Sequence, residues 1–155
     1  MPTIEELIKQ TKFRDQKHKA IISIIYTCGL LNNFHEDYFK KYNLTTQQYN
    51  ALRILRGQHP KPATVNLIRE RMMDKMSDAS RIVERLRKAG FVDRVVNKND
   101  RRAVDVIITE KGLAVLNEID LNDEKTDLPT RYLSQDESKE LSRLLEKMIN
   151  ALVEH

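Results

Sequence analysis

The stretch from Ser77 to Gly112 constrains the fold most strongly, because its hydrophobic period changes abruptly within it. Up to Gly90 the apolar residues recur at helical spacing: Ala79, Ile82, Val83, Leu86 and Ala89. After Gly90 the period moves toward two, in β-prone runs at residues 91–96 and 103–108. The sequence therefore predicts a helix capped by Ser77 and ended by Gly90, followed by a two-stranded hairpin.

The polar residues of this stretch are rich in cations. The second face of the predicted helix carries Asp78, Ser80, Arg81, Glu84, Arg85 and Lys88. The predicted hairpin turn, residues 97–102, combines turn formers with three cations. A basic helix alone would be an ordinary solvated helix. A basic helix followed at once by a basic hairpin is typical of a winged helix-turn-helix, in which the helix can enter a major groove.

The upstream segments complete that motif. Thr45 and Gln48 have the capping-box spacing at the start of a helix, which Pro60 and Pro62 end. Thr64 then caps a short helix, and residues 73–76 form the turn into the Ser77 helix. We therefore predict a mainly α fold with a small β-hairpin wing, a winged helix-turn-helix.

Both ends of the chain are helical and more apolar than one small core needs. A short helix at Thr3–Glu6 precedes a long one from Asp15 to about Tyr42, and further helices follow Thr109 and Ser134. The alternative is that the last helix covers its own domain, but the surplus at both ends favours dimerisation. The predicted dimer contacts are Ile21, Ile25, Leu141, Leu145, Met148 and Leu152. The expected organisation is residues 1–43 for N-terminal dimerisation helices, 44–112 for DNA binding and 113–155 for C-terminal dimerisation helices.

The charge distribution agrees with a polyanionic partner. The net charge is +4 overall, and it is +5 for residues 1–66, +5 for 67–102 and −6 for 103–155. One cysteine, Cys28, excludes an intramolecular disulfide and fits a reducing compartment. We find no apolar run of transmembrane length and no signal-peptide core, so we expect a cytoplasmic protein. Phosphate-loop, metal-ligand and nucleophile motifs are absent, so we expect no enzyme, no cofactor and no metal.

Three motifs resemble the multiple-antibiotic-resistance regulator (MarR) family of bacterial transcription factors. They are Leu44-Thr45-x-x-Gln48-Tyr49-x-x-Leu52, Ser80-Arg81-Ile82-Val83-Glu84-Arg85-Leu86-x-x-x-Gly90-Phe91-Val92-x-Arg94, and Asp100-Arg101-Arg102-Ala103 leading to Ile108-Thr109-Glu110-Lys111-Gly112. The resemblance implies a dimer that binds pseudo-palindromic double-stranded DNA and responds to a small aromatic effector. It also implies that Arg102 lies at the minor groove and that Asp100 orients it.

The same resemblance implies an effector pocket where the long first helix and the Thr109 helix meet the winged core. Ile22, Tyr26 and Leu30 are the pocket candidates, although core packing also explains their apolar character. Peroxide sensing through Cys28 is not expected, because the residue falls about two turns too late in the helix. His18, His35 and His59 do not form a convincing zinc site with Cys28.

These observations predict a homodimeric, sequence-specific DNA-binding transcriptional regulator controlled by a small molecule, with repression as the expected mode and activation left open. The predicted DNA contacts are Ser77, Asp78, Ser80, Arg81 and Arg85 in the major groove, Thr64 at a phosphate, and Lys98, Arg101 and Arg102 in the wing. Arg85 could instead contact a phosphate or form an internal ion pair. The alternative function is a winged-helix module for protein contacts. The sequence does not identify the operator, the regulated genes or the effector.

Overall fold

The computed structural model describes residues 1–97, 104–122 and 127–154. The predicted wing residues Lys98, Asp100, Arg101 and Arg102 therefore lie outside the described residues. The chain forms two compact units, Met1–Glu118 and Ile119–His155. The predicted division into three segments is not tested by this and stays a prediction.

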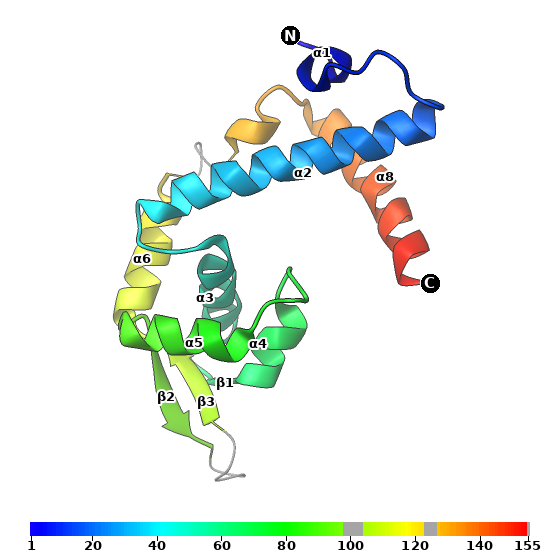
Figure 1. The fold of residues 1–155 in the computed structure, drawn as a ribbon. Coiled ribbons are helices and arrows are strands. Elements are labelled where there is room, and N and C mark those ends of the chain that lie inside the picture. Colours follow the sequence, from blue (N-terminus) through cyan, green and yellow to red (C-terminus); the bar gives the residue numbers. More distant parts are fainter. Residues whose placement is uncertain (98–103, 123–126, 155) are drawn as a thin grey trace. The chain divides into compact units, whose positions relative to one another are not determined.

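The first unit is mainly helical, with a small sheet (Figure 1). Its helices are α1 (Ile4–Ile8), α2 (Gln16–Lys40), α3 (Thr46–Gln58), α4 (Val65–Arg71), α5 (Ala79–Lys88) and α6 (Glu110–Asp120), which reaches into the second unit. The strands are β1 (Ala63–Thr64), β2 (Val92–Val96) and β3 (Val104–Ile108), antiparallel in the order β1-β3-β2. The predicted winged helix-turn-helix is confirmed. β1 was not predicted, because two residues are too short to show a period.

Side-chain caps define most helix ends as predicted. The capping boxes at Thr3, Thr45 and Ser134 all form, and Thr64 caps α4. The N-cap assigned to Ser77 was wrong: Asp78 caps α5, and its carboxylate accepts a hydrogen bond from the Arg81 backbone at 3.0 Å. An anionic oxygen is the stronger acceptor at a helix N-terminus.

Gly90 and Gly112 fix the junction between helix and wing. Gly90 has a φ of +78° and ends α5 as predicted. A Cβ on Gly112 would collide with the Phe91 carbonyl oxygen and lie 2.7 Å from the Ile108 side chain. Only glycine therefore lets the first turn of α6 approach the sheet this closely.

The core of the first unit lies between α3, α4, α5 and the sheet. α5 buries Ala79, Ile82, Val83 and Leu86, as its spacing predicts, whereas Ala89 is exposed because it is the C-cap. The other helices and strands contribute Leu52, Leu55, Ile68, Met72, Val92, Val106 and Ile108. α5 packs against α3, α4 and β2, so the core holds it on one side only.

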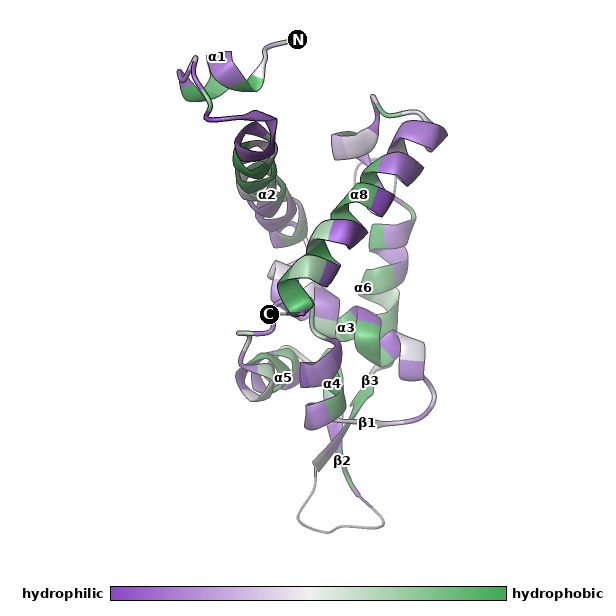
Figure 2. Ribbon diagram, turned by 90° about the vertical axis from the view of Figure 1, so that its right-hand side faces the viewer, coloured by the Kyte–Doolittle hydropathy of each residue, from purple (hydrophilic) through white to green (hydrophobic). Residues whose placement is uncertain are grey.

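The second unit contains a 3-10 helix (Leu128–Thr130) and α8 (Gln135–Val153). Apolar residues follow one side of α8 and polar residues the other (Figure 2). Leu141, Met148 and Leu152 are 44%, 37% and 75% exposed. On α2, Ile21 and Ile25 are exposed as well. None of the helices that the structure describes combines the length and hydropathy needed to cross a membrane.

Candidate nucleic-acid interface

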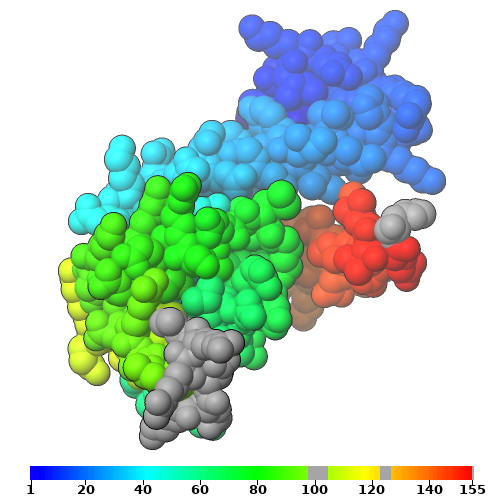
Figure 3. All heavy atoms as spheres, turned by 60° about the horizontal axis from the view of Figure 1, so that its bottom comes forward, coloured from blue at the N-terminus to red at the C-terminus, as the bar shows by residue number. Residues whose placement is uncertain are grey.

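α5 presents a basic face on the side away from the core. Arg81, Arg85 and Lys88 are exposed, together with Ser80. In the part of the chain that the structure describes, neither Arg81 nor Arg85 has a side-chain hydrogen bond or an ion pair. The internal ion pair considered for Arg85 is thus not found there. In Figure 3 the green surface of α4 and α5 lies open on the face turned to the viewer.

A second pair of arginines is held by one carboxylate. Glu84 accepts from Arg87, whose Nη2 lies 2.8 Å from Oε1 and whose Nε lies 3.2 Å from Oε2. Arg94 on β2 places its Nη2 3.1 Å from Oε2 of the same residue. The hydrogen bonds from Arg87, with the charges of Arg87 and Arg94, lower the pKa of Glu84. Glu84 therefore links α5 to β2.

Three predicted DNA contacts already have intramolecular roles. Asp78 caps α5, Thr64 caps α4, and Ser77 donates its hydroxyl to Asp74 at 2.9 Å. A cap can also lie beside a phosphate, since the helix N-terminus attracts anions. The carboxylate of Asp78 would instead repel one. The DNA contacts assigned to these residues stay predictions.

Asp74 organises the turn before α5, and this role was not predicted. Its carboxylate accepts from the Met76 backbone (3.0 Å), the Ser77 hydroxyl (2.9 Å) and the Gln47 side chain on α3 (3.0 Å). These hydrogen bonds, the one from Met76 first, lower the pKa of Asp74. Asn50 on α3 also accepts from the Met73 backbone at 2.9 Å. Two amide side chains of α3 thus fix the turn.

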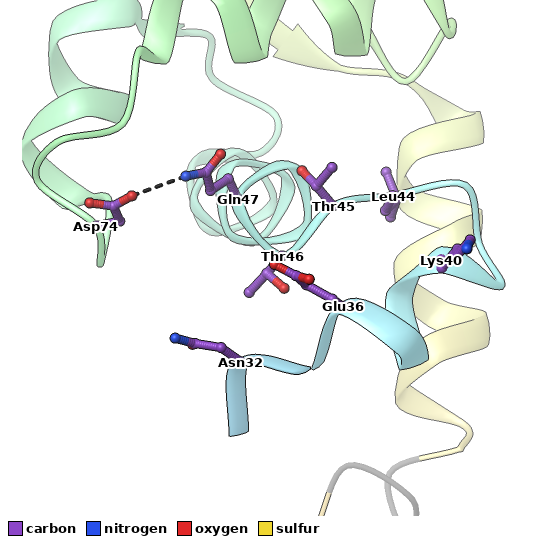
Figure 4. A pocket seen from close by; sticks show the side chains of 8 residues that line it. All are labelled: Asn32, Glu36, Lys40, Leu44, Thr45, Thr46, Gln47 and Asp74. Atoms are coloured by element: carbon purple, nitrogen blue, oxygen red, sulfur yellow. Dashed lines mark hydrogen bonds between the residues drawn. The ribbon is translucent and has the colours of Figure 1, made fainter. Parts of the chain in front are cut away.

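A cavity of about 560 Å³ borders this turn (Figure 4). Its lining comes from α2, the start of α3 and the turn: Asn32, Glu36, Lys40, Leu44, Thr45, Thr46, Gln47 and Asp74. The Thr46 hydroxyl is buried there without a hydrogen-bond partner among the described atoms. Ile22, Tyr26 and Leu30 do not line this cavity, so the effector pocket assigned to them stays a prediction.

The base of the wing is locked to the end of α5. Thr109 donates its hydroxyl to the Gly90 carbonyl (2.8 Å) and accepts from the Gly112 backbone (3.1 Å). Lys111 donates to the Ala89 carbonyl (2.6 Å) and lies 4.8 Å from the centre of the Phe91 ring. The Thr-x-x-Gly motif therefore ties the start of α6 to the C-terminal end of α5.

The described residues contain no group of three or more His, Cys, Asp or Glu side chains that could hold a metal ion. Cys28 is a free, exposed residue of α2.

Comparison with known proteins identifies this architecture. The model of the MarR family matches residues 42–103. The transcriptional regulator MgrA of Staphylococcus aureus is 33% identical over 139 residues, covering 89% of this chain and 92% of the relative.

Two solved structures have the same fold. A mutant MarR from E. coli complexed with operator DNA has a TM-score of 0.75 at 21% identity, covering 89% of this chain and 99% of that one. The organohalide-sensing regulator RdhR in its 2,4-dichlorophenol-bound form has a TM-score of 0.77 at 18% identity, covering 92% and 86%. The family resemblance predicted from the sequence is confirmed: the chain belongs to the MarR family and is a DNA-binding transcriptional regulator rather than an enzyme.

Proposed function

We propose that two copies of this chain bind a pseudo-palindromic operator as a repressor, each inserting α5 into a major groove. The observation that carries the proposal is the pair of arginines on α5, Arg81 and Arg85, exposed without an internal partner among the described residues. Ten helical residues span about 15 Å, enough to cross a major groove. A module for protein contacts does not need two unpaired guanidinium groups on this face.

The proposed dimer rests on apolar side chains at both ends of the chain. Ile21 and Ile25 on α2 are 46% and 62% exposed, and Leu141 on α8 is 44% exposed. Burying such side chains stabilises an interface by about 25 cal/mol for each Å² removed from water. In a two-fold dimer the two α5 helices would read half-sites about 34 Å apart, one turn of DNA.

We further propose that a small molecule controls DNA binding. RdhR was crystallised with 2,4-dichlorophenol, which supports an effector of that size and aromatic character. Two places could receive it: the predicted pocket at Ile22, Tyr26 and Leu30, and the cavity beside Asp74. The cavity has the direct mechanical link, because a ligand that displaces Gln47 from Asp74 would loosen the turn that precedes α5.

Selection of bound duplexes from a random pool tests the proposed function. The expected result is one enriched pseudo-palindrome with half-sites about 10 base pairs apart, bound by a dimer. Adding 2,4-dichlorophenol to the purified protein–DNA complex should then lower the affinity of the protein for the selected duplex. A pool that shows no enrichment would favour the protein-contact alternative.

A further inference from the structure

Glu84 is an unexpected residue on a helix that binds a polyanion. The buried face of α5 consists of Ala79, Ile82, Val83 and Leu86, and helical spacing places Glu84 on the opposite side, near Arg81 and Lys88. Its side chain is half-buried, whereas Arg81 and Arg85 are exposed, but its charge still lies on the same helix as theirs. Phosphates would repel that charge, so its presence there needs an explanation.

The geometry shows what the carboxylate does in the free protein. Both oxygens are occupied: Oε1 by Arg87 at 2.8 Å, and Oε2 by Arg87 at 3.2 Å and Arg94 at 3.1 Å. Arg87 and Arg94 remain 43% and 49% exposed, so the contacts engage their charges and not the whole side chains. Arg94 belongs to β2, and the contact therefore joins two different elements of the DNA-binding domain.

We infer that Glu84 is a specificity-determining residue that withholds Arg87 and Arg94 from DNA phosphates. Non-specific affinity rises with each cation that reaches a phosphate, whereas specificity is the ratio of operator affinity to non-specific affinity. By holding two arginines and adding one repulsive charge, Glu84 lowers the non-specific affinity. Arg81 and Arg85 stay free to make operator contacts. The inference rests on the proposed position of α5 in the major groove.

Two other roles for Glu84 make different predictions. A carboxylate can accept a hydrogen bond from a cytosine amino group, which would make Glu84 a direct reader of sequence. It can also simply stabilise its helix through the pair with Arg87. The chain contains a matched control for that second role: Glu140 and Arg143 of α8 form the same i,i+3 pair, with Nη2–Oε1 at 2.6 Å and Nε–Oε2 at 2.7 Å.

The experiment compares Glu84→Gln with Glu140→Gln in salt titrations on a random duplex and on the selected operator. Glu84→Gln should bind the random duplex about 3- to 10-fold more tightly, with a salt slope steeper by about one to two, because the freed cations release counterions. The ratio of operator to random affinity should fall. Glu140→Gln should change none of these quantities.

A second substitution separates withheld arginines from a simple change of net charge. Arg94→Gln should weaken random-duplex binding more in the Glu84→Gln background than in the wild type, since only there is Arg94 free to reach a phosphate. Equal effects in both backgrounds would overturn the inference. So would an unchanged random affinity, or a loss confined to the operator, which would make Glu84 a cytosine reader.

Arg81→Ala, measured on the same duplexes, separates the role given to Glu84 from the proposed placement of α5 in the major groove. If it weakens operator binding while Glu84→Gln changes nothing, only the role given to Glu84 fails. If neither substitution has an effect, the placement of α5 in the groove fails as well.

Discussion

Leu86 of α5 is fully buried, whereas Leu141 of α8, also one of an apolar series at helical spacing, is 44% exposed. The winged core buries its apolar residues within one chain, and the exposed face of α5 is polar and basic. α8 shows the reverse, with apolar side chains left in contact with water. The same helical spacing of apolar residues therefore serves internal packing in α5 and, as we propose, association between two chains in α8.

The largest expected difference between the two regions comes from one substitution made in each. Leu86→Ala should lower the free energy of unfolding by about 2–5 kcal/mol at any protein concentration, because it leaves a cavity in a complete core. The cost of Leu141→Ala should grow as protein concentration rises, because dimerisation stabilises only the associated chain. Urea unfolding at two concentrations measures both. A concentration-independent loss for Leu141→Ala would remove α8 from the interface.

Backbone fit inside the core gives the next largest effect. Gly112→Ala should cost about 1–3 kcal/mol, because its Cβ would overlap the Phe91 carbonyl and the Ile108 side chain. Gly57→Ala in α3 is the matched control, since a Cβ there meets nothing within 4 Å. That control should raise stability by up to about 1 kcal/mol through helix propensity. Thermal unfolding of both variants measures the two effects. Equal shifts of the melting temperature would contradict the close packing at Gly112.

Helix caps should matter differently in the two regions. Asp78→Ala should destabilise the whole winged core by about 1 kcal/mol, because α5 is part of its cooperative unit. Ser134→Ala removes the corresponding cap of α8 and should mainly fray that helix. Hydrogen exchange resolves the two outcomes. Faster exchange in α5 after Ser134→Ala, or in α8 after Asp78→Ala, would show that the two regions unfold as one unit.

The smallest effect is a pH dependence. The hydrogen bonds from Met76, Ser77 and Gln47 hold the pKa of Asp74 below its ordinary value of 3.8 in the folded protein. The ionised form therefore stabilises the fold above that value, and this contribution is lost as the pH falls through the lower, folded pKa. Asp74→Asn should make the free energy of unfolding of the core depend less on pH at the acid end. Glu137→Gln in α8 should leave that pH dependence unchanged.

Most of the fold could be predicted from local sequence patterns. Each capping box, at Thr3, Thr45 and Ser134, spans only four residues of the chain. Each could therefore be predicted from spacing alone. The cap of α5 was misassigned because Ser77 and Asp78 are adjacent capping residues, and Asp74 takes the serine hydroxyl.

The candidate site was less predictable, because it depends on contacts between distant residues. Gln47 meets Asp74 27 residues later. Glu84 meets Arg94 only because the chain reverses at Gly90 and β2 then packs against α5. The sequence predicted which residues of α5 are polar. It could not show which arginines are free and which are held.

Reading of bases by α5 is the central claim, and Arg81 tests it most directly. Arg81→Ala should weaken binding to the selected operator by about 1–3 kcal/mol and change random-duplex affinity little, because it removes a bidentate contact to a base. Arg81→Lys should restore only part of the loss, since an ammonium lacks the planar pair of parallel donors that a guanidinium offers to a base. Equal losses on both duplexes, or full recovery with lysine, would mean that Arg81 contacts a phosphate and that α5 does not read sequence through it.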